Sequence, residues 1–399
     1  MAGKKFKQRK TDVIMDGIVY RLYTNTYPVY KNTYYVYTYT DDLPEKVIVA
    51  DRIDDRPVTF LDTKCFQRSL CKEVILPNSI LSIGSESFGG CRNLETIHIP
   101  SNIKGVAYDA FYKSKKLNHT SFSYGRYLGN DENPFLILHT NERALKSGED
   151  EELIVEVHPE TRFILSSAFN GYSPDSAPYD KPDKLILHDK LEHIDGGAFS
   201  FGFYGFDYAK VETIYVDSME CLCRGCNEIP GRAKRLIVGG EEIGDTITIP
   251  ASVTEIAYHC FYKYDKVKMI RFEGDILTIG HGAFKDCKNL KEIQFPQKIS
   301  TINFEAFYGC SSLEKVELFE VEKIESFAFE LDHPSWPGAK MKPRSDGLRE
   351  VNFRNRVGTL CNNAFSYNAM LETVMGMENV ENIEGDPFVG TPFETKVAE

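Results

Sequence analysis

Phenylalanine recurs in this chain at intervals of about 23 residues, inside a constant frame of neighbouring residue types. Phe261, Phe284 and Phe307 follow one another at intervals of 23 residues, and Phe329 comes 22 residues later. The frame is I-x-x-x-A-F-x-x-C-x-x-L-x-x-I-x-I-P, and its phenylalanines are Phe88, Phe111, Phe261, Phe284, Phe307, Phe329, Phe365 and Phe388. A fixed period of this length indicates one supersecondary unit stacked on copies of itself. The sequence therefore predicts a solenoid.

The clearest copy of the repeat is IGHGAFKDCKNLKEIQFP, residues 279–296. Its second half alternates, so Ile293 and Phe295 are expected to point to the core while Glu292 and Gln294 point outward. Such alternation predicts a short β-strand with one buried face, ended by a proline that cannot donate to a strand ladder. Each repeat should contribute one strand of this kind to a parallel sheet.

The Ala-Phe pair in the first half of the frame predicts a spine of stacked rings. A small residue next to a large aromatic one allows close passage of the neighbouring coil while the ring fills the interior. Burial of one such ring contributes roughly 1.5–3 kcal/mol. We therefore interpret the repeated phenylalanines as core residues.

The bulk properties exclude several classes of partner. The net charge of −12 argues against nucleic acid, whose phosphates require an excess of Lys and Arg. No run of 18 apolar residues is present, so no membrane insertion is expected. The basic start, MAGKKFKQRK, lacks the apolar segment of a secretory signal. As written, the chain is predicted to be cytoplasmic, and it would be secreted or on the cell surface if a signal had been removed.

The ten cysteines are expected to be buried, unpaired thiols rather than disulfides. Cys91, Cys287 and Cys310 each fall three residues after a repeat phenylalanine, a position that stacks along a solenoid. The trio Cys221, Cys223 and Cys226 could suggest zinc, with His259 and Cys260 arriving from elsewhere in the fold. Zinc sites usually need four ligands in matched pairs, and no obvious fourth ligand lies nearby. We therefore predict no metal and interpret the trio as an irregular coil.

Departures from the period define the predicted domain organisation. Tyrosines and β-branched residues alternate before the first repeat, which predicts a β cap over the open sheet edge of the solenoid. A stacking platform for sugars is the alternative interpretation of the tyrosines, with Tyr37 as its test residue. The predicted parts are a basic tail (1–12), a Tyr-rich β cap (13–50), a solenoid (51–390) with insertions near 123–152, 201–210, 221–244 and 330–347, and a C-terminal tail (391–399).

The repeat frame resembles the BspA-type leucine-rich repeat family. The resemblance is carried by IGSESFGGCRNLETIHIP (83–100), IGHGAFKDCKNLKEIQFP (279–296) and INFEAFYGCSSLEKVELF (302–319), and more weakly by YLGNDENPFLILH (127–139) and DGIVYRLY (16–23). It implies a right-handed, curved, β-rich solenoid with short parallel strands on the concave face. It also implies adhesion or protein binding, and it brings no catalytic residues. The missing secretion signal is a departure from most bacterial members and leaves the cellular location open.

Direct searches for catalytic chemistry find nothing to nominate. The acidic run at 149–152 lacks the alternating ligands and the glycine turn of a calcium loop. The nine histidines share no spacing with a serine or cysteine. No phosphate-binding loop, dinucleotide motif or HExxH sequence is present. The chain is therefore predicted not to be an enzyme and to need no cofactor.

Binding is expected on the outward residues of the parallel sheet and on the insertions. Alignment of the strands places His98, Tyr215, Arg271, Gln294, Glu317, Asn352 and Met375 in one outward row and Met269 in a companion row, and Trp336 stands on a proline-rich insertion. Simple solvation of the sheet face is the alternative, although Tyr, Arg and Met are enriched at interfaces. The predicted partner is a protein. A glycan that stacks on the Tyr-rich cap and Trp336 is the alternative, and the sequence gives no signal for an oligomeric state.

Overall fold

The computed structural model describes a parallel β-solenoid in two compact units. The first unit comprises Met1–Glu142, Phe163–Gly171 and Gly197–Ser200, and the second comprises Arg143–Arg162, Tyr172–Gly196 and Phe201–Glu399. The described residues are 7–24, 30–107, 109–118, 120–122, 125–128, 136–140, 152, 154–165, 183–194, 198, 211–226, 229–331 and 346–393. The prediction of a β-rich solenoid with short parallel strands is confirmed.

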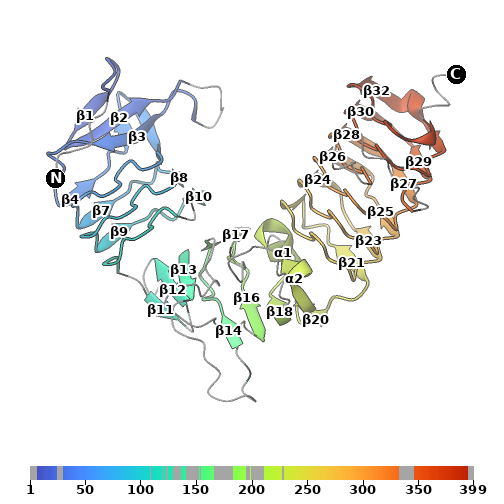
Figure 1. Ribbon diagram of the computed structural model, residues 1–399, viewed down its shortest axis with the longest axis horizontal. Helices are drawn as coiled ribbons and strands as arrows, with labels where there is room; N and C mark the ends of the chain where they lie inside the picture. Colours follow the sequence, from blue (N-terminus) through green and yellow to red (C-terminus); the bar gives the residue numbers. More distant parts are fainter. Residues whose placement is uncertain are drawn as a thin grey trace. The chain divides into compact units, whose positions relative to one another are not determined.

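Each coil of the second unit from residue 246 onward contributes a strand to each of two parallel rows (Figure 1). We call the row predicted from the sequence the recognition row: β21 (Thr246–Ile249), β23 (Met269–Phe272), β25 (Glu292–Gln294), β27 (Lys315–Leu318), β29 (Glu350–Phe353) and β31 (Thr373–Met375). The second row is β22 (Glu255–Ile256), β24 (Ile276–Ile279), β26 (Lys298–Ile302), β28 (Glu320–Ile324), β30 (Val357–Leu360) and β32 (Val380–Ile383). This second row was not anticipated from the sequence.

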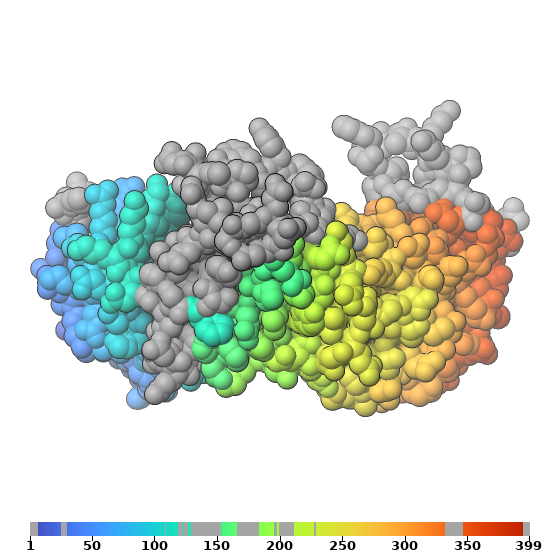
Figure 2. Space-filling view, turned by 90° about the horizontal axis from the view of Figure 1, so that it is seen from below, coloured from blue at the N-terminus to red at the C-terminus, as the bar shows by residue number. Residues whose placement is uncertain are grey.

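The order of the coils in space follows the order of the sequence. In the space-filling view (Figure 2) the colour changes from yellow to red along this stack, because each coil lies beside the next one in the chain. The register is constant as well. Ile270 of β23 pairs with Ile293 of β25, and Ile279 of β24 pairs with Ile302 of β26, so buried positions face buried positions throughout.

Earlier coils of the second unit are less regular. Strands β14 (Ile154–Glu156), β16 (Lys184–Leu187), β18 (Val211–Val216) and β19 (Ala233–Val238) are parallel, and β20 (Glu241–Glu242) pairs with β19 antiparallel. Strand β17 (His193–Ile194) also belongs to this part. Two short helices, α1 (Met219–Gly225) and α2 (Ile229–Arg232), follow β18 within the stretch predicted as an insertion. Ser218 caps α1 by accepting a hydrogen bond from the Cys221 N–H at 3.1 Å.

The first unit begins with an antiparallel sheet that continues into parallel coils. Strands β1 (Val13–Met15), β2 (Ile18–Leu22) and β3 (Tyr34–Tyr39) are antiparallel, and β3 then pairs parallel with β6 (Arg56–Leu61), followed by β8 (Ser82–Ile83) and β10 (Gly105–Val106), with β5 (Arg52–Ile53) antiparallel to β6. The other strands are β4 (Lys46–Ile48), β7 (Glu73–Ile75) and β9 (Thr96–His98), which are parallel, and β11 (Thr120–Phe122), β12 (Gly125–Leu128), β13 (Leu136–Thr140) and β15 (Phe163–Ile164). The antiparallel start covers a sheet edge, as a cap must.

The repeat phenylalanines form ladders of stacked, nearly parallel rings inside each unit. In the second unit the centroid distance is 5.0 Å between Phe261 and Phe284, 5.2 Å between Phe284 and Phe307, and 5.0 Å between Phe307 and Phe329. The ladder continues through Phe365 to Phe388. In the first unit Phe66, Phe88 and Phe111 stack in the same way. The predicted aromatic spine is confirmed within each unit, and Phe66 belongs to it although it was not among the eight predicted positions.

Hydrogen bonds between neighbouring coils explain the alanine and the cysteine of the repeat. The Phe284 N–H donates to the carbonyl of Ala306 in the next coil at 2.8 Å, which requires close backbone approach and explains the small residue. The Cys287 thiol donates to the carbonyl of Phe261 in the preceding coil at 3.1 Å. Asn368 occupies the cysteine position of its own coil and donates from Nδ2 to the Phe329 carbonyl at 2.9 Å. The position thus selects a small donor rather than a thiol as such.

Candidate functional site

The strand register confirms the alignment from which the binding residues were predicted. Arg271 lies opposite Gln294, and Glu317 lies opposite Asn352, which in turn lies opposite Met375. His98 is the outward residue at the end of β9, and Tyr215 holds the equivalent place in β18. These residues therefore form short outward rows inside each unit. Their binding roles remain predictions.

The predicted residues differ in their exposure. Met375 is 40% exposed, and His98, Arg271 and Gln294 are exposed as well. The half-buried members are Tyr215, Met269 and Glu317. The expectation for Asn352 was wrong, because this residue was predicted to be exposed on the sheet face and is only 6% exposed. Its strand, β29, is buried over three consecutive residues and does not alternate. Trp336 lies outside the described residues.

Neighbouring coils are connected by pairs of polar side chains across the recognition row. The Arg271 Nε donates to Gln294 Oε1 at 3.0 Å, and Lys315 Nζ lies 2.8 Å from Glu350 Oε1. In the first unit Glu73 accepts from Lys46 Nζ at 3.0 Å and lies 3.2 Å from His98 Nε2. Lys46, together with His98, holds the pKa of Glu73 below its usual value. Exposed pairs of this kind contribute about 0–1 kcal/mol to stability. A binding partner can therefore replace these contacts with its own at little cost in free energy.

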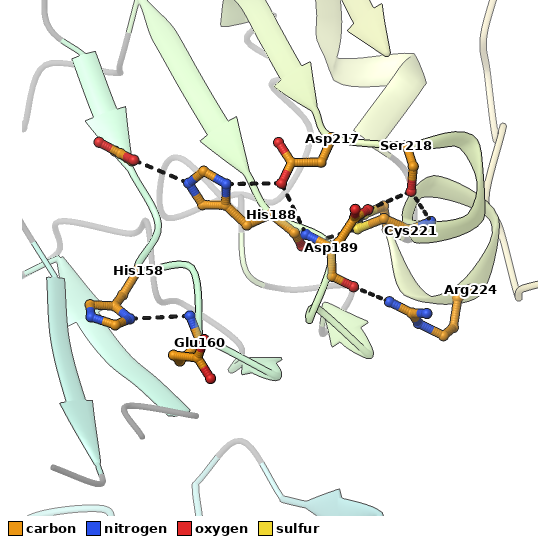
Figure 3. Close-up of polar contacts among 10 residues, drawn as sticks. His158, Glu160, His188, Asp189, Asp217, Ser218, Cys221 and Arg224 are labelled. Carbon is orange, nitrogen blue, oxygen red and sulfur yellow. Dashed lines mark hydrogen bonds and ion pairs between the residues drawn. The ribbon is translucent and has the colours of Figure 1, made fainter. Parts of the chain in front are cut away.

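A partly buried histidine, His188, connects the ends of three strands in the second unit (Figure 3). His188, which follows β16, has Nε2 at 3.1 Å from Glu156 Oε1 and Nδ1 at 3.1 Å from Asp217 Oδ2. Glu156 ends β14 and Asp217 follows β18, so this contact links three successive coils. No sequence pattern predicts this contact, because the repeat period is broken between the three residues.

The hydroxyl and backbone groups around His188 are engaged in structural contacts (Figure 3). The Ser218 hydroxyl donates to Asp189 Oδ1 and accepts from the Cys221 N–H. Arg224 donates to the carbonyls of Asp189 and Leu191. These contacts attach α1 to the preceding coil. They do not place a hydroxyl or thiol nucleophile on the ring nitrogens of His188, which both face carboxylates.

Two members of the cysteine trio lie on the buried side of α1, and the third, Cys226, is its C-cap. Cys221, Cys223 and Cys226 are fully buried, and the Sγ atoms of Cys221 and Cys226 are 3.9 Å apart. Cys260 joins the trio from the next coil, where its thiol donates to the Leu222 carbonyl at 3.2 Å. Its pKa is raised by burial first and by Cys223 second, which disfavours the thiolate that binds metals. His259 lies apart, with its ring stacked on Tyr258 and Tyr262.

All ten cysteines are free thiols, as the sequence predicts. Among the described residues, no group of three or more His, Cys, Asp or Glu side chains has the arrangement of a metal site. In that same part of the chain, no helix is long and apolar enough to cross a membrane.

The tyrosines of the N-terminal sheet contact one another and the first coil. Tyr35 stacks on Phe60 with centroids 4.7 Å apart, and Tyr23 and Tyr30 meet Phe60 edge to face at 5.6 and 5.1 Å. The Arg21 guanidinium carbon lies 3.4 Å above the ring of Tyr37. One face of Tyr35 and one face of Tyr37 are therefore in contact with the protein itself, and both interpretations of the tyrosines remain predictions.

Comparison with known proteins identifies the repeat. The model of the BspA type leucine rich repeat region matches six copies, over residues 59–131, 243–333 and 344–397. A search of curated proteins found no match.

Several solved structures are similar to this chain at low identity. A leucine rich cell surface protein from Faecalibacterium prausnitzii is 16% identical, with 92% of this chain and 95% of that chain covered and a TM-score of 0.36. A leucine-rich repeat protein from Bacteroides ovatus is 19% identical, with 95% and 92% covered and a TM-score of 0.33. The pneumococcal vaccine antigen PcpA is 15% identical, with 96% and 89% covered and a TM-score of 0.30.

All three TM-scores lie below 0.5, so the assignment rests on the repeat match, which spans more than half of the chain. The ladder of phenylalanines, the donor at the cysteine position and the two strand rows agree with that match. The chain belongs to the BspA-type leucine-rich repeat family.

Proposed function

We propose that this chain is a non-catalytic interaction module of the adhesion type, which binds a protein partner through the outward face of the recognition row. The observation that carries the proposal is the composition of that face. Exposed Arg271 and Met375 and half-buried Met269 stand among exchangeable polar pairs on a rigid sheet. Arg and Met are enriched at protein interfaces, and a rigid surface loses little conformational entropy on binding.

The ionisable groups support a role without catalysis. The pKa values of Cys226, Cys260 and Cys287 are raised, the first chiefly by its contact with Cys221 and the other two by burial. A thiol with a raised pKa is a poor nucleophile at neutral pH. His188 is held between two carboxylates. The insertions near 123–152, 201–210, 221–244 and 330–347, and Trp336 within the last, are proposed to add contacts beside the sheet.

The proposal is tested by affinity capture from a mixed protein extract, followed by measurement of the affinity for the recovered protein. Arg271→Glu should reduce that affinity, because it reverses the charge of an exposed residue on β23 of the recognition row. Lys298→Glu makes the same reversal on the second row, where Lys298 pairs with Glu320 at 3.2 Å, and should leave the affinity unchanged. Equal effects of the two variants, or an effect of Lys298→Glu alone, would contradict the proposed surface.

A further inference from the structure

A groove of about 580 Å³ lies in the second unit where α1 meets the second row. Helix α1 packs against β22 there, and β24 is the next strand of the row, paired with β22. The polar and aromatic residues that line the groove are Glu220, Arg224, Ser252, Thr254, Glu255, Tyr258, Thr278 and His281. A volume of this size is within the range of small-molecule sites, roughly 300–1,000 Å³. The groove is separate from the recognition row.

A row of outer aromatic rings begins in this groove and continues along the following coils. Tyr258, His281 and Phe304 each stand three residues before a repeat phenylalanine, and Phe327 stands two before. Neighbouring rings meet edge to face, with centroids 5.1 Å apart for Tyr258–His281, 5.1 Å for His281–Phe304 and 5.2 Å for Phe304–Phe327. Tyr258 is 47% exposed and the others are half-buried. Unlike the inner ladder, this row presents aromatic surface to solvent.

The remaining lining is rich in hydroxyl groups and carboxylates. Ser252, Thr254, Tyr258 and Thr278 each carry a hydroxyl that both donates and accepts hydrogen bonds. Glu255 and Thr278 are aligned in register on neighbouring strands, so their side chains share the sheet face. Glu220 accepts a hydrogen bond from the Ser252 hydroxyl, which holds its pKa below the usual value and keeps the carboxylate ionised.

The groove carries two carboxylates, Glu220 and Glu255, against one guanidinium, Arg224. Arg224 is committed to the carbonyl oxygens of Asp189 and Leu191. Burial lowers the pKa of His281, despite the opposing effect of Glu305, so its imidazole is neutral at pH 7. The carboxylates of Glu220 and Glu255 would repel an anion. A neutral ligand with many hydroxyl groups and one apolar face therefore fits the groove best.

We propose that this groove is a binding site for a neutral saccharide. His259 stacks on one face of the Tyr258 ring at 3.9 Å, and the side chain is still 47% exposed, so one sugar ring stacks its C–H face on the opposite, electronegative face. The sugar hydroxyls donate to the carboxylates of Glu220 and Glu255 and exchange hydrogen bonds with Thr254 and Thr278. Further units of a linear saccharide extend along the outer aromatic row past His281 to Phe304. The site is independent of the protein-binding surface proposed above, because it uses the second row.

The proposal is tested by calorimetric titration of the full chain with neutral glucose-, mannose- and N-acetylglucosamine-based oligosaccharides of increasing length. At least one series should bind, and affinity should rise with length as more rings of the row are engaged. Tyr258→Ala should weaken binding roughly tenfold, the affinity equivalent of one aromatic face contact. Tyr258→Phe keeps the ring and should change the affinity far less. Phe304→Ala should weaken only the longer oligosaccharides.

Matched controls separate this site from other surfaces. Tyr112 is 54% exposed in the first unit and outside the groove, so Tyr112→Ala should leave saccharide binding unchanged. Arg271→Glu should also leave it unchanged, which distinguishes this proposal from the protein-binding surface. Thermal unfolding confirms that each variant is folded. The absence of binding by every neutral series, undiminished binding by Tyr258→Ala, or preferential binding of a lysine-rich peptide or a sulfated saccharide would overturn the proposal.

Discussion

Replacement of one interior ring of the phenylalanine ladder should destabilise the chain by an amount that depends on its neighbours. Phe284 is fully buried and stacks between Phe261 and Phe307, at 5.0 and 5.2 Å, with planes only 2° apart. Phe284→Ala should lower the free energy of unfolding by about 3–5 kcal/mol, because it leaves a cavity. Stacked aromatic pairs contribute about 0.5–1.5 kcal/mol each beyond area burial. Phe284→Leu, which retains most of the volume, should therefore cost about 1–3 kcal/mol.

The end of the ladder supplies the internal comparison. Among the described residues, Phe111 at the end of the ladder in the first unit has one aromatic neighbour, Phe88, at 5.5 Å, so Phe111→Leu should cost only about 0.5–1.5 kcal/mol. Urea unfolding followed by circular dichroism measures both variants. A double-mutant cycle of Phe284→Leu with Phe307→Leu should give a coupling free energy of about 0.5–1.5 kcal/mol. Phe284→Leu with Phe111→Leu should be additive within about 0.5 kcal/mol. Equal losses at both positions, or no coupling between neighbours, would refute the ladder argument.

Three further predictions concern the backbone, the N-terminal sheet and the thiols. Gly225→Ala would place a Cβ atom 2.1 Å from the Glu192 carbonyl oxygen and should lower the free energy of unfolding in urea by about 1–3 kcal/mol. Gly244→Ala is the control, because nothing lies within 4 Å of a Cβ atom at that position. Equal losses for the two variants would contradict the close approach at Gly225. Desolvation raises the pKa of Asp12, but the bidentate contact with Arg21 at 2.8 and 2.9 Å and the contacts with Arg9 outweigh it and lower the pKa below the ordinary 3.8. The stabilisation by Asp12 is therefore present above pH 3.8 and is lost as the pH falls through the lower pKa of the folded state. Asp12→Asn should be less stable than the parent chain at pH 7, and the difference in unfolding free energy should shrink in acid. A difference that does not shrink would show that the ion pair with Arg21 is unimportant. The ten buried thiols should react with a thiol reagent only after unfolding, and rapid labelling of several in the native chain would show that the coils are open.

The sequence predicted the fold well because one residue type marks every coil. The spacing of the phenylalanines gave the solenoid, and the alternation around Ile293 gave the first strand row. The second row escaped prediction because its strands do not alternate. In β24, β26 and β28 the buried residues recur three positions apart, as Ile299 and Ile302 do, rather than two apart. The donor role of the cysteine position follows from the structure alone, where Asn368 donates to the Phe329 carbonyl as Cys287 does to the equivalent carbonyl of Phe261.

The candidate sites were predicted less completely, for a physical reason. Contacts between coils depend on register, which the sequence shows only where the period is unbroken. His188, Glu156 and Asp217 come together across irregular segments, so their spacing carries no signal. The outer aromatic row was visible in the sequence at a fixed offset from the ladder, but only the structure shows that its rings meet and open into a groove.

Site-specific photo-crosslinking tests the central functional claim most directly. A photoreactive phenylalanine analogue placed at Gln294 or Met375 reports contacts of the recognition row, and the same analogue at Leu277 or Lys298 reports the second row. The account predicts covalent adducts with the captured protein partner from the first pair and none from the second. Adducts from the second pair alone, or equal adducts from both, would contradict it.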